Sequence, residues 1–219
     1  MVSGSFLPTC ADLVSRGAVR RCAHKRVHRI YQALKLNKRR KGKRRLPNRV
    51  RQPLAQPAQV NEVWSVDFMS DSMVGNRKFR TFNVIDDCSR KALAIEIDTS
   101  LSAKRIIRTL NRIGESRGFP MVIRSDNGPE FTSGNFKIWC EEKGIETRFI
   151  QPGKPTQNGY IERFNRLYRE AVLDAYLFFD LDQVRQLTSE WIEEYNQRRP
   201  HEGLNNMTPL EWKLTRPLA

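Results

Sequence analysis

The sequence predicts an α/β fold in which a mixed sheet is flanked by helices and preceded by a basic helix and linker. Three observations lead to this fold class. Between residues 62 and 179, strand-like runs come first and then alternate with helical stripes, in the order β-β-β-α-β-α-β. Helical patterns dominate residues 180–219. Residues 1–61 carry the whole formal net charge of +15 and little apolar periodicity.

The composition is that of a soluble chain with one sizeable core. The 219 residues are 39% hydrophobic and 29% charged, and no apolar run approaches the ~18 residues of a membrane span. The first twenty residues also lack the pattern of a signal peptide. We therefore expect a cytoplasmic protein with no membrane partner. The four cysteines are scattered without a CxxC pair, so we expect reduced thiols rather than a disulfide framework.

The basic N-terminal region divides at residue 24. Residues 1–23 show no convincing period and are assigned to no fold. Residues 24–61 are predicted to form a short amphipathic helix and then a proline-containing linker, dense in Lys and Arg, that lies along nucleic-acid backbone. The alternative is a basic tail that merely aids solubility. The expected DNA contacts are Lys25, Arg26, Arg29, Lys38, Arg39, Arg40, Lys41, Lys43, Arg44 and Arg45.

Three strands are predicted at the start of the globular part. Residues 63–68 alternate large apolar side chains with Ser and Asp, which is the two-residue period of a strand with the carboxylate of Asp67 on its less apolar face. Two runs rich in Phe, Val, Ile and Thr follow, at 79–85 and 92–97, and the polar turn 86–90 separates them. We expect these strands to pair in meander order.

The chain then alternates helices with strands. A helical stripe begins at Ala103 and stops before Gly118, and a short apolar strand that ends at Asp126 follows it. The expected elements are a helix over 103–117, a strand over 121–123, a helix around 136–140, a strand over 145–150 and a C-terminal helix over about 181–196.

A further helix is predicted from Tyr160 to Val172, after a loop rich in turn residues. Its apolar positions recur at helical spacing and would be buried. Glu162 lies off that stripe, on a polar side that it shares with Asn165 and Arg169. The helix can therefore bury its aromatic face while presenting a carboxylate and basic groups to a cleft.

Three acids need a common explanation: Asp67 on the first strand, Asp126 at the end of the fourth and Glu162 on the helix after the fifth. Acids beside apolar residues are costly to keep charged unless a cation or hydrogen bonds compensate. Two Mg²⁺ ions held by carboxylates, about 3.5–4 Å apart, could activate a water or a sugar hydroxyl for in-line attack on phosphorus. The alternative is three ordinary structural or solvent-facing acids.

The sequence around these acids resembles a known family. The runs SDNGPEF at 125–131 and PGKPTQNGYIERFN at 152–165, with 35 residues between Asp126 and Glu162, look like the DDE catalytic domain of bacterial insertion-sequence transposases. The match is to the second-frame protein of two-frame insertion sequences, and the same domain type resembles retroviral integrase. The run YNQRRPH at 195–201 is also typical of these transposases.

The resemblance covers residues 24–212 and implies a ribonuclease H-like core over 62–179 with a helical extension over 180–219. It implies that the three acids are the catalytic and metal-binding residues, with Mg²⁺ as cofactor and Mn²⁺ as a substitute. The implied reaction is DNA strand cleavage and strand transfer by a nucleoid-associated homo-oligomer on double-stranded DNA. Lys154, Gln157, Asn158 and Arg163 flank the expected site and are candidates for contacts to that DNA.

The resemblance also implies a helix-turn-helix region of which 24–37 would be the last helix. Residues 1–22 do not look like the preceding helices, so we expect a truncated or frame-shifted start. Two other functions stay open: a ribonuclease that cuts the RNA strand of a hybrid, and a catalytically silent DNA-binding remnant.

Several other residues compete for a metal. We interpret Asp86 and Asp87 as turn residues and Glu130 as a loop acid. His24 and His28 have the spacing of a zinc pair, but no CxxC follows, so we expect no zinc.

Overall fold

The computed structural model describes residues 29, 32–34, 56–151 and 158–215. It divides the chain into two units, Met1–Val50 and Arg51–Ala219. In the first unit, Arg29, Gln32 and Ala33 lie within the helix predicted over 24–37, and they are helical and exposed. Residues 1–23 lie outside the described residues, as do the remaining DNA contacts expected in this unit: Lys25, Arg26, Lys38, Arg39, Arg40, Lys41, Lys43, Arg44 and Arg45.

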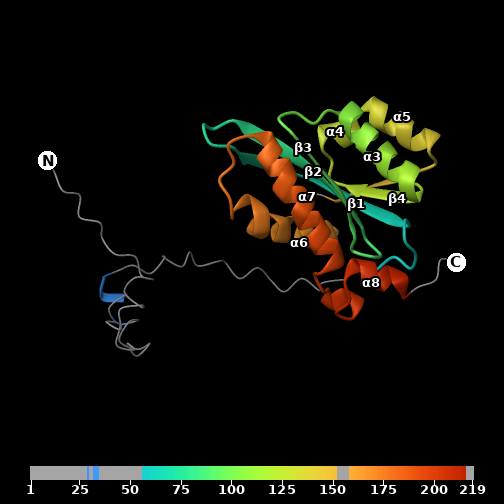
Figure 1. The fold of residues 1–219 in the computed structure, drawn as a ribbon. Coiled ribbons are helices and arrows are strands. Elements are labelled where there is room, and N and C mark those ends of the chain that lie inside the picture. The colour runs from blue at the N-terminus through green and yellow to red at the C-terminus, as the bar shows by residue number, and fades with distance from the viewer. Residues whose placement is uncertain (1–28, 30–31, 35–55, 152–157, 216–219) are drawn as a thin grey trace. The chain divides into compact units, whose positions relative to one another are not determined.

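The second unit is built on a mixed five-stranded sheet in the order β3-β2-β1-β4-β5 (Figure 1). The first three strands pair antiparallel, whereas β4 pairs in parallel with β1 and β5 in parallel with β4. The prediction of a mixed sheet that opens with a meander is therefore confirmed. The strands are β1 (Val63–Ser72), β2 (Lys78–Asp86), β3 (Ala92–Asp98), β4 (Val122–Ser125) and β5 (Glu146–Phe149).

The loop between β1 and β2 explains why these two strands are antiparallel. Met73 donates its backbone N–H to the carbonyl of Arg77 at 2.9 Å, and Asn76 donates to the carbonyl of Met73 at 3.1 Å. Gly75 and Asn76 both have positive φ, of 87° and 62°, which these residue types tolerate best. So short a loop can join only antiparallel strands, whereas the parallel β1–β4 pair needs a long crossover.

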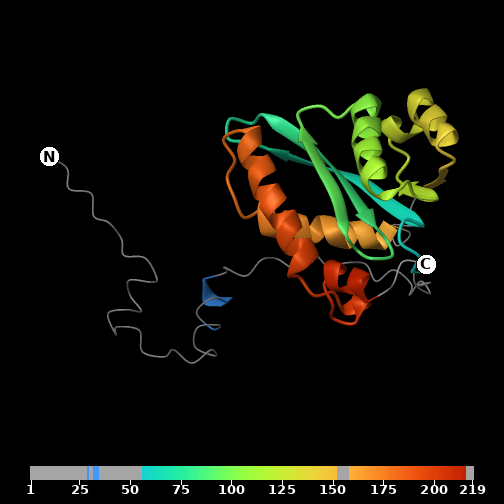
Figure 2. The ribbon, with the colours of Figure 1, turned by 45° about the vertical axis from the view of Figure 1, so that its right-hand side comes forward.

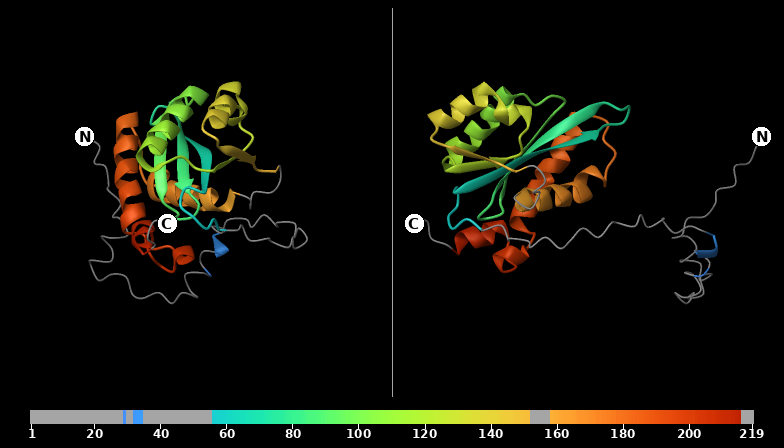
Figure 3. Two further views of the ribbon diagram at one scale, coloured as in Figure 1. Left: turned by 90° about the vertical axis from the view of Figure 1, so that its right-hand side faces the viewer. Right: turned by 180° about the vertical axis from the view of Figure 1, so that it is seen from behind.

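Helices cover both faces of the sheet, as Figures 2 and 3 show. One face carries α3, α4 and α5, and the other carries α6, its π-helical continuation η2, and α7. Within the described residues, no helix has the length and apolar character needed to cross a membrane. The helices are α3 (Ala103–Arg117), α4 (Pro129–Thr132), α5 (Gly134–Glu142), α6 (Gly159–Tyr168), η2 (Arg169–Leu173), α7 (Leu181–Gln197), the 3₁₀ turn η3 (Glu202–Leu204) and α8 (Pro209–Leu214).

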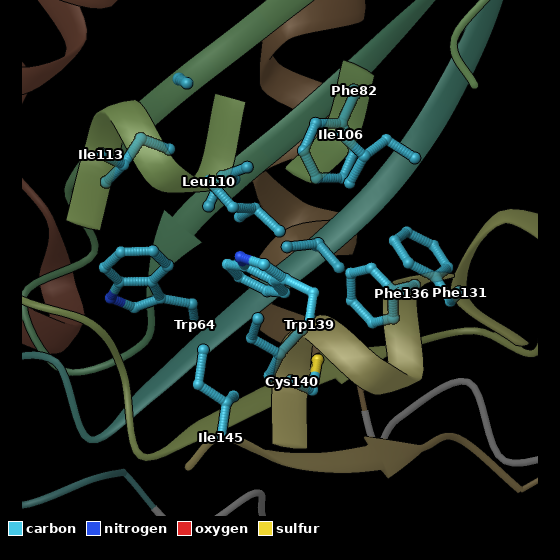
Figure 4. Close-up of a cluster of buried hydrophobic side chains, with 14 of the residues drawn as sticks. Trp64, Phe82, Ile106, Leu110, Ile113, Phe131, Phe136, Trp139, Cys140 and Ile145 are labelled. Carbon is cyan, nitrogen blue, oxygen red and sulfur yellow. The ribbon is translucent and has the colours of Figure 1, made fainter. Parts of the chain in front are cut away.

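The first core lies between the sheet and α3, α4 and α5 (Figure 4). Trp64 and Phe82 contribute from the sheet and Trp139 from α5, and all three are buried as their apolar patterns predict. The indole N–H of Trp139 donates to the side-chain oxygen of Asn111 on α3 at 2.9 Å. This bond satisfies the polar atom of a buried aromatic residue and ties α5 to α3.

The second core lies on the opposite face and holds α6 in place. Phe164 and Tyr168 of α6 pack against Trp191 and Tyr195 of α7, with ring centroids 5.1–5.4 Å apart. The hydroxyls of Tyr168 and Thr188 share a hydrogen bond of 2.7 Å. Burial of this aromatic side of α6 leaves its polar side free to approach the end of β1.

Two elements differ from what the sequence predicts. The short helix α4 was not predicted, and it places Glu130 in its first turn, so the interpretation of Glu130 as a loop acid is wrong. Pro129 at the first helical position has its φ fixed near the helical value, which favours this turn. The helix predicted from Tyr160 to Val172 is α-helical only as far as Tyr168 and then widens into the π-helix η2.

Candidate active site

Asp67 lies on β1, opposite Asn83 of β2, on the sheet face that α6 covers. One carboxylate oxygen accepts the backbone N–H of Phe68 at 2.8 Å, and the other accepts the side-chain amide of Asn165 from α6 at 2.7 Å. Asn83 donates in turn to the amide oxygen of Asn165 at 2.7 Å. This chain of hydrogen bonds fixes the orientation of the Asp67 carboxylate against α6.

The topology brings Asp126 close to Asp67. Strand β4 runs parallel to β1 with Ser65 opposite Arg124. Two residues further along each segment, Asp67 of β1 therefore lies beside Asp126, which directly follows β4. Asp126 is exposed, and one of its carboxylate oxygens accepts the backbone N–H of Gly128 at 3.1 Å.

Glu162 reaches the same region from α6. It lies in the first turn of that helix, where the positive end of the helix dipole favours a carboxylate, and it is exposed. Asn165 lies one turn after Glu162 on the same face of α6 and donates a hydrogen bond to Asp67. This bond holds α6 with Glu162 facing β1.

The electrostatics of Asp67 report how close the three acids are. Burial and the negative charges of Asp126 and Glu162 together raise the pKa of Asp67 to about 6, against the lowering effect of its hydrogen bonds. The structure therefore places Asp126, just after β4, and Glu162, on α6, each within electrostatic range of Asp67 on β1.

An open cleft of about 480 Å³ lies beside Asp67 and Glu162. Asn165, Arg166 and Arg169 also line it. Arg169 is held by the carboxylate of Asp71 at 3.3 Å and the carbonyl of Ser70 at 3.2 Å. The cleft thus combines carboxylates suited to a divalent cation with guanidinium groups suited to phosphate.

Comparisons with known proteins identify this arrangement. Two family models, each described as an integrase core domain, match residues 57–155 and 143–209. An uncharacterized 31.7 kDa protein of insertion element IS407 from Burkholderia multivorans is 39% identical over 189 residues, covering 86% of this chain and 68% of that protein. The chain belongs to the integrase core domain family.

A second relative of this integrase core also comes from an insertion element. An uncharacterized 39.2 kDa protein of insertion element IS476 from Xanthomonas euvesicatoria is 39% identical over 191 residues, which are 86% of this chain and 55% of that protein. This chain therefore spans about two thirds of the length of the IS407 protein and little more than half of the length of the IS476 protein.

Solved structures show the same fold at low sequence identity. A chain of the simian T-cell lymphotropic virus intasome matches with a TM-score of 0.64 and 19% identity, over 76% of this chain and 59% of that one. The HTLV-2 integrase catalytic core domain in complex with magnesium matches with a TM-score of 0.56 and 18% identity, over 69% of this chain and 95% of that one. The ribonuclease H-like fold expected from the sequence is thus confirmed.

Magnesium fits the donor chemistry of this integrase core. Mg²⁺ prefers oxygen ligands and is commonly held by one or two carboxylates, with water and phosphate oxygens completing its shell. A cation at the cleft would offset the burial and the negative neighbours that raise the pKa of Asp67. As the side chains are placed, no group of three or more His, Cys, Asp or Glu residues in the described part of the chain could by itself hold a metal ion. Water and substrate oxygens would therefore have to contribute.

The competing acids Asp86 and Asp87 serve the fold of the integrase core. Asp86 accepts the backbone N–H of Ser89 at 2.8 Å, as the interpretation of a turn residue predicts. Both side chains are nevertheless fully buried, which that interpretation did not anticipate. Arg124 donates to Asp87 at 2.7 Å, and Arg117 lies 3.7 Å from Asp86. Half-buried arginines thus balance both charges.

The third competitor, Glu130, is also engaged. Its carboxylate accepts a guanidinium N–H of Arg80 at 2.5 Å. The same guanidinium lies over the ring of Phe68, 4.2 Å from its centroid.

The four residues expected to flank the site are placed differently from one another. Lys154 and Gln157 lie outside the described residues. Asn158 is buried, and its side-chain oxygen has no hydrogen-bond partner among the described residues. Arg163 is exposed and lines a second pocket rather than the cleft beside the acids.

Two residues of the site were missed from the sequence. Arg166 lines the cleft one helical turn after Glu162, and the i,i+4 spacing on a helix was the signal for it. Asn83 orients Asn165 from the middle of β2. Asparagine is disfavoured in strands, so its presence at a central strand position was a usable signal.

Proposed function

We propose that this integrase core cuts DNA strands and joins them to target DNA, as the catalytic part of an insertion-sequence transposase. The supporting observation is that Asp126 and Glu162, from separate parts of the chain, both act electrostatically on Asp67, which lines an open cleft together with Glu162. Such a cluster of carboxylates is suited to Mg²⁺, with Mn²⁺ as a substitute. When bound, the divalent cation supplies stabilisation of the charge that develops on the phosphoryl oxygens.

The residues of the chain prepare the site for in-line displacement at phosphorus. In that reaction an attacking oxygen, from water or from a 3′-hydroxyl, forms one P–O bond while the bond to the leaving oxygen breaks. Asp67, Asp126 and Glu162 would hold the cation, and Asn165 orients Asp67. Arg166 and Arg169 line the same cleft and would bind the non-bridging phosphate oxygens.

Double-stranded DNA is the proposed partner, and the charge distribution supports it. The formal net charge of +15 lies in residues 1–61, whereas the rest of the chain has equal numbers of acids and bases. We further propose that the chain works as a homo-oligomer on DNA, because one structural neighbour is an intasome chain and the HTLV-2 core domain is described in dimeric and trimeric forms.

The experiment is a strand-joining assay on the full chain, with a pre-cut duplex end, a target plasmid and Mg²⁺ or Mn²⁺. We expect joining by the wild type, and a loss of about a hundredfold or more in the Asp126→Asn variant because one carboxylate of the cation site is gone. DNA affinity should be unchanged or higher in this variant, since a negative charge near phosphate has been removed.

The matched control is Asp182→Asn, which makes the same charge change at an exposed position of α7. It should join DNA like the wild type. Undiminished joining by Asp126→Asn, or no metal-dependent joining by the wild type, would contradict the proposal. Cleavage of the RNA strand of a hybrid without joining of DNA would instead identify a ribonuclease.

A further inference from the structure

A second pocket lies on the side of α6 away from the acidic cleft. It encloses about 130 Å³ between α6, the loop after β2, the end of α7 and the turn η3. Arg90, Tyr160, Arg163, Tyr195 and His201 are among the residues that line it, and we call it the arginine pocket. The proposed reaction uses none of these side chains.

The charge around the arginine pocket is strongly positive. Arg90, Arg163 and Arg199 all act electrostatically on His201 and on Tyr195. None of these three arginines makes an ion pair with an acid in the described part of the chain. Glu202 also lines the pocket, from an exposed position on η3. Arg90 and Arg163 therefore line this small volume, and the charge of Arg199 acts on the same His201 ring from outside the lining.

Arg90 is fixed in place before any ligand arrives. Its backbone has a positive φ of 59°, which is unusual for a residue other than glycine. Its guanidinium donates to the carbonyl of Asp87 at 2.6 Å and lies over the ring of Tyr160, 3.2 Å from the centroid. Ordering this side chain on ligand binding would cost little entropy, because it is already ordered.

His201 gives the pocket an unsatisfied polar atom. Its ring is hydrogen-bonded to the backbone of Tyr195, but its Nε2 atom is buried with no partner among the described residues. Burial, together with the charges of Arg199, Arg163 and Arg90, lowers the pKa of His201 to about 4. An anion in the pocket would offset the arginine charges and so favour protonation of His201, whose Nε2 could then donate to that anion instead of remaining a buried acceptor without a partner.

We propose that the arginine pocket binds a single phosphate group, supplied by the backbone of DNA that lies against this side of α6. A volume of about 130 Å³ is large enough to admit one phosphate group. Guanidinium forks match phosphate oxygens in charge and geometry.

The DNA backbone is favoured as the source of this phosphate by the positions of the arginines. Arg163 and Arg199 are exposed, so a polymer on the surface can reach them. Arg163 directly follows Glu162 on α6, so the DNA proposed to lie at the acidic cleft passes next to this helix, on whose other side the arginine pocket lies. The assignment of the source rests on the proposed function, whereas the assignment of phosphate rests on the pocket.

The first test compares neighbouring arginines of the full chain. Arg199→Gln removes one of the three positive charges that act on His201, and Arg198→Gln removes a charge at the adjacent exposed position, which is not among them. Arg199→Gln should weaken duplex binding by about threefold to tenfold and flatten the slope of log K against log salt by about 0.9. Arg198→Gln should leave both quantities near the wild-type values. Equal effects of the two substitutions would overturn the proposal.

The second test follows the His201 imidazole by NMR, with His201→Gln to assign its signals. Inorganic phosphate, compared with chloride at equal ionic strength, should raise the pH at which His201 titrates by at least about one unit, because the anion offsets Arg90, Arg163 and Arg199. A short duplex should do the same, and a duplex of neutral methylphosphonates should not.

The outcomes of the second test separate the possible failures. A response to inorganic phosphate but not to the duplex would overturn DNA as the source. A response to neither, in a chain that still binds DNA, would overturn the pocket and leave the proposed function intact. A response to both in a chain that joins no DNA would contradict the proposed function alone.

Discussion

Asp67, half-buried on β1, and Asp87, fully buried in the turn after β2, both have a pKa that burial raises to about 6. Their charged neighbours differ in sign. Asp87 accepts from the guanidinium of Arg124 at 2.7 Å, whereas the charges that act on Asp67 are those of Asp126 and Glu162. Burial by itself thus does not distinguish an acid that serves the fold from one suited to bind a cation. The sign of the neighbouring charge does.

The hydrogen bonds of Asp67 strengthen this contrast. Asn165 and Asn83 are neutral, so they orient the carboxylate without cancelling its charge. The side chain therefore stays fixed and negative, and a cation can supply the missing compensation.

The largest expected effect is at Asp87. The Asp87→Asn substitution leaves the half-buried guanidinium of Arg124 without its charged partner, and the free energy of unfolding should fall by about 3 kcal/mol. Urea unfolding followed by circular dichroism measures this. The control Asp182→Asn, which breaks an exposed pair with Arg185, should change stability by less than about 0.5 kcal/mol. Equal values for the two variants would mean that the buried pair contributes nothing.

The sequence predicts the elements of the fold well, because the apolar periods are local and strong. The three opening strands, the helix after Ser102 and the α7 helix all appear within one to four residues of their predicted bounds. What it could not predict are features decided by tertiary contacts. The π-helical turn after Tyr168 keeps Val172 and Leu173 buried, and no local pattern distinguishes it from ordinary helix.

The candidate site was predicted in part for the same reason. Asp67, Asp126 and Glu162 stand in local motifs, so their residue types and spacing were readable. The interpretation of Asp86 and Asp87 as turn residues missed their complete burial, because Arg117 and Arg124 come from distant parts of the chain. Partners separated by about 30 residues leave no periodic signal.

The next effect is smaller and has the opposite sign. The Asp67→Asn substitution removes a buried negative charge among negative neighbours, so the free energy of unfolding should rise by about 1 kcal/mol at pH 8. The full shift in the pKa of Asp67 implies a larger rise in the free energy of unfolding, but asparagine offers Phe68 and Asn165 one acceptor fewer than aspartate does. Urea titrations of both proteins at several pH values measure the difference.

The pH dependence of that difference follows from the raised pKa of Asp67. Because the folded pKa of about 6 lies above the ordinary value of 3.8 for an aspartate, the folded state binds more protons between these values. The wild-type carboxyl therefore favours folding most below pH 4, and this contribution is lost as the pH rises through 6. The advantage of Asp67→Asn should accordingly vanish near pH 4. A gain of the same size at pH 4 and pH 8 would mean that charge is not its cause.

The smallest expected effect separates the two aspartates by their response to metal. A ligand that binds only the folded state stabilises it by RT ln(1 + [L]/Kd), which is about 1 kcal/mol at a Mg²⁺ concentration five times Kd. If Asp67 belongs to the cation site and Asp87 does not, Mg²⁺ should raise the melting temperature of the wild type and of Asp87→Asn equally. It should have no effect on Asp67→Asn beyond that of an equal ionic strength of NaCl. EDTA should reverse the increase. A shift that survives in Asp67→Asn would place the cation elsewhere on the chain, and a shift lost in Asp87→Asn would assign the buried pair a part in holding it.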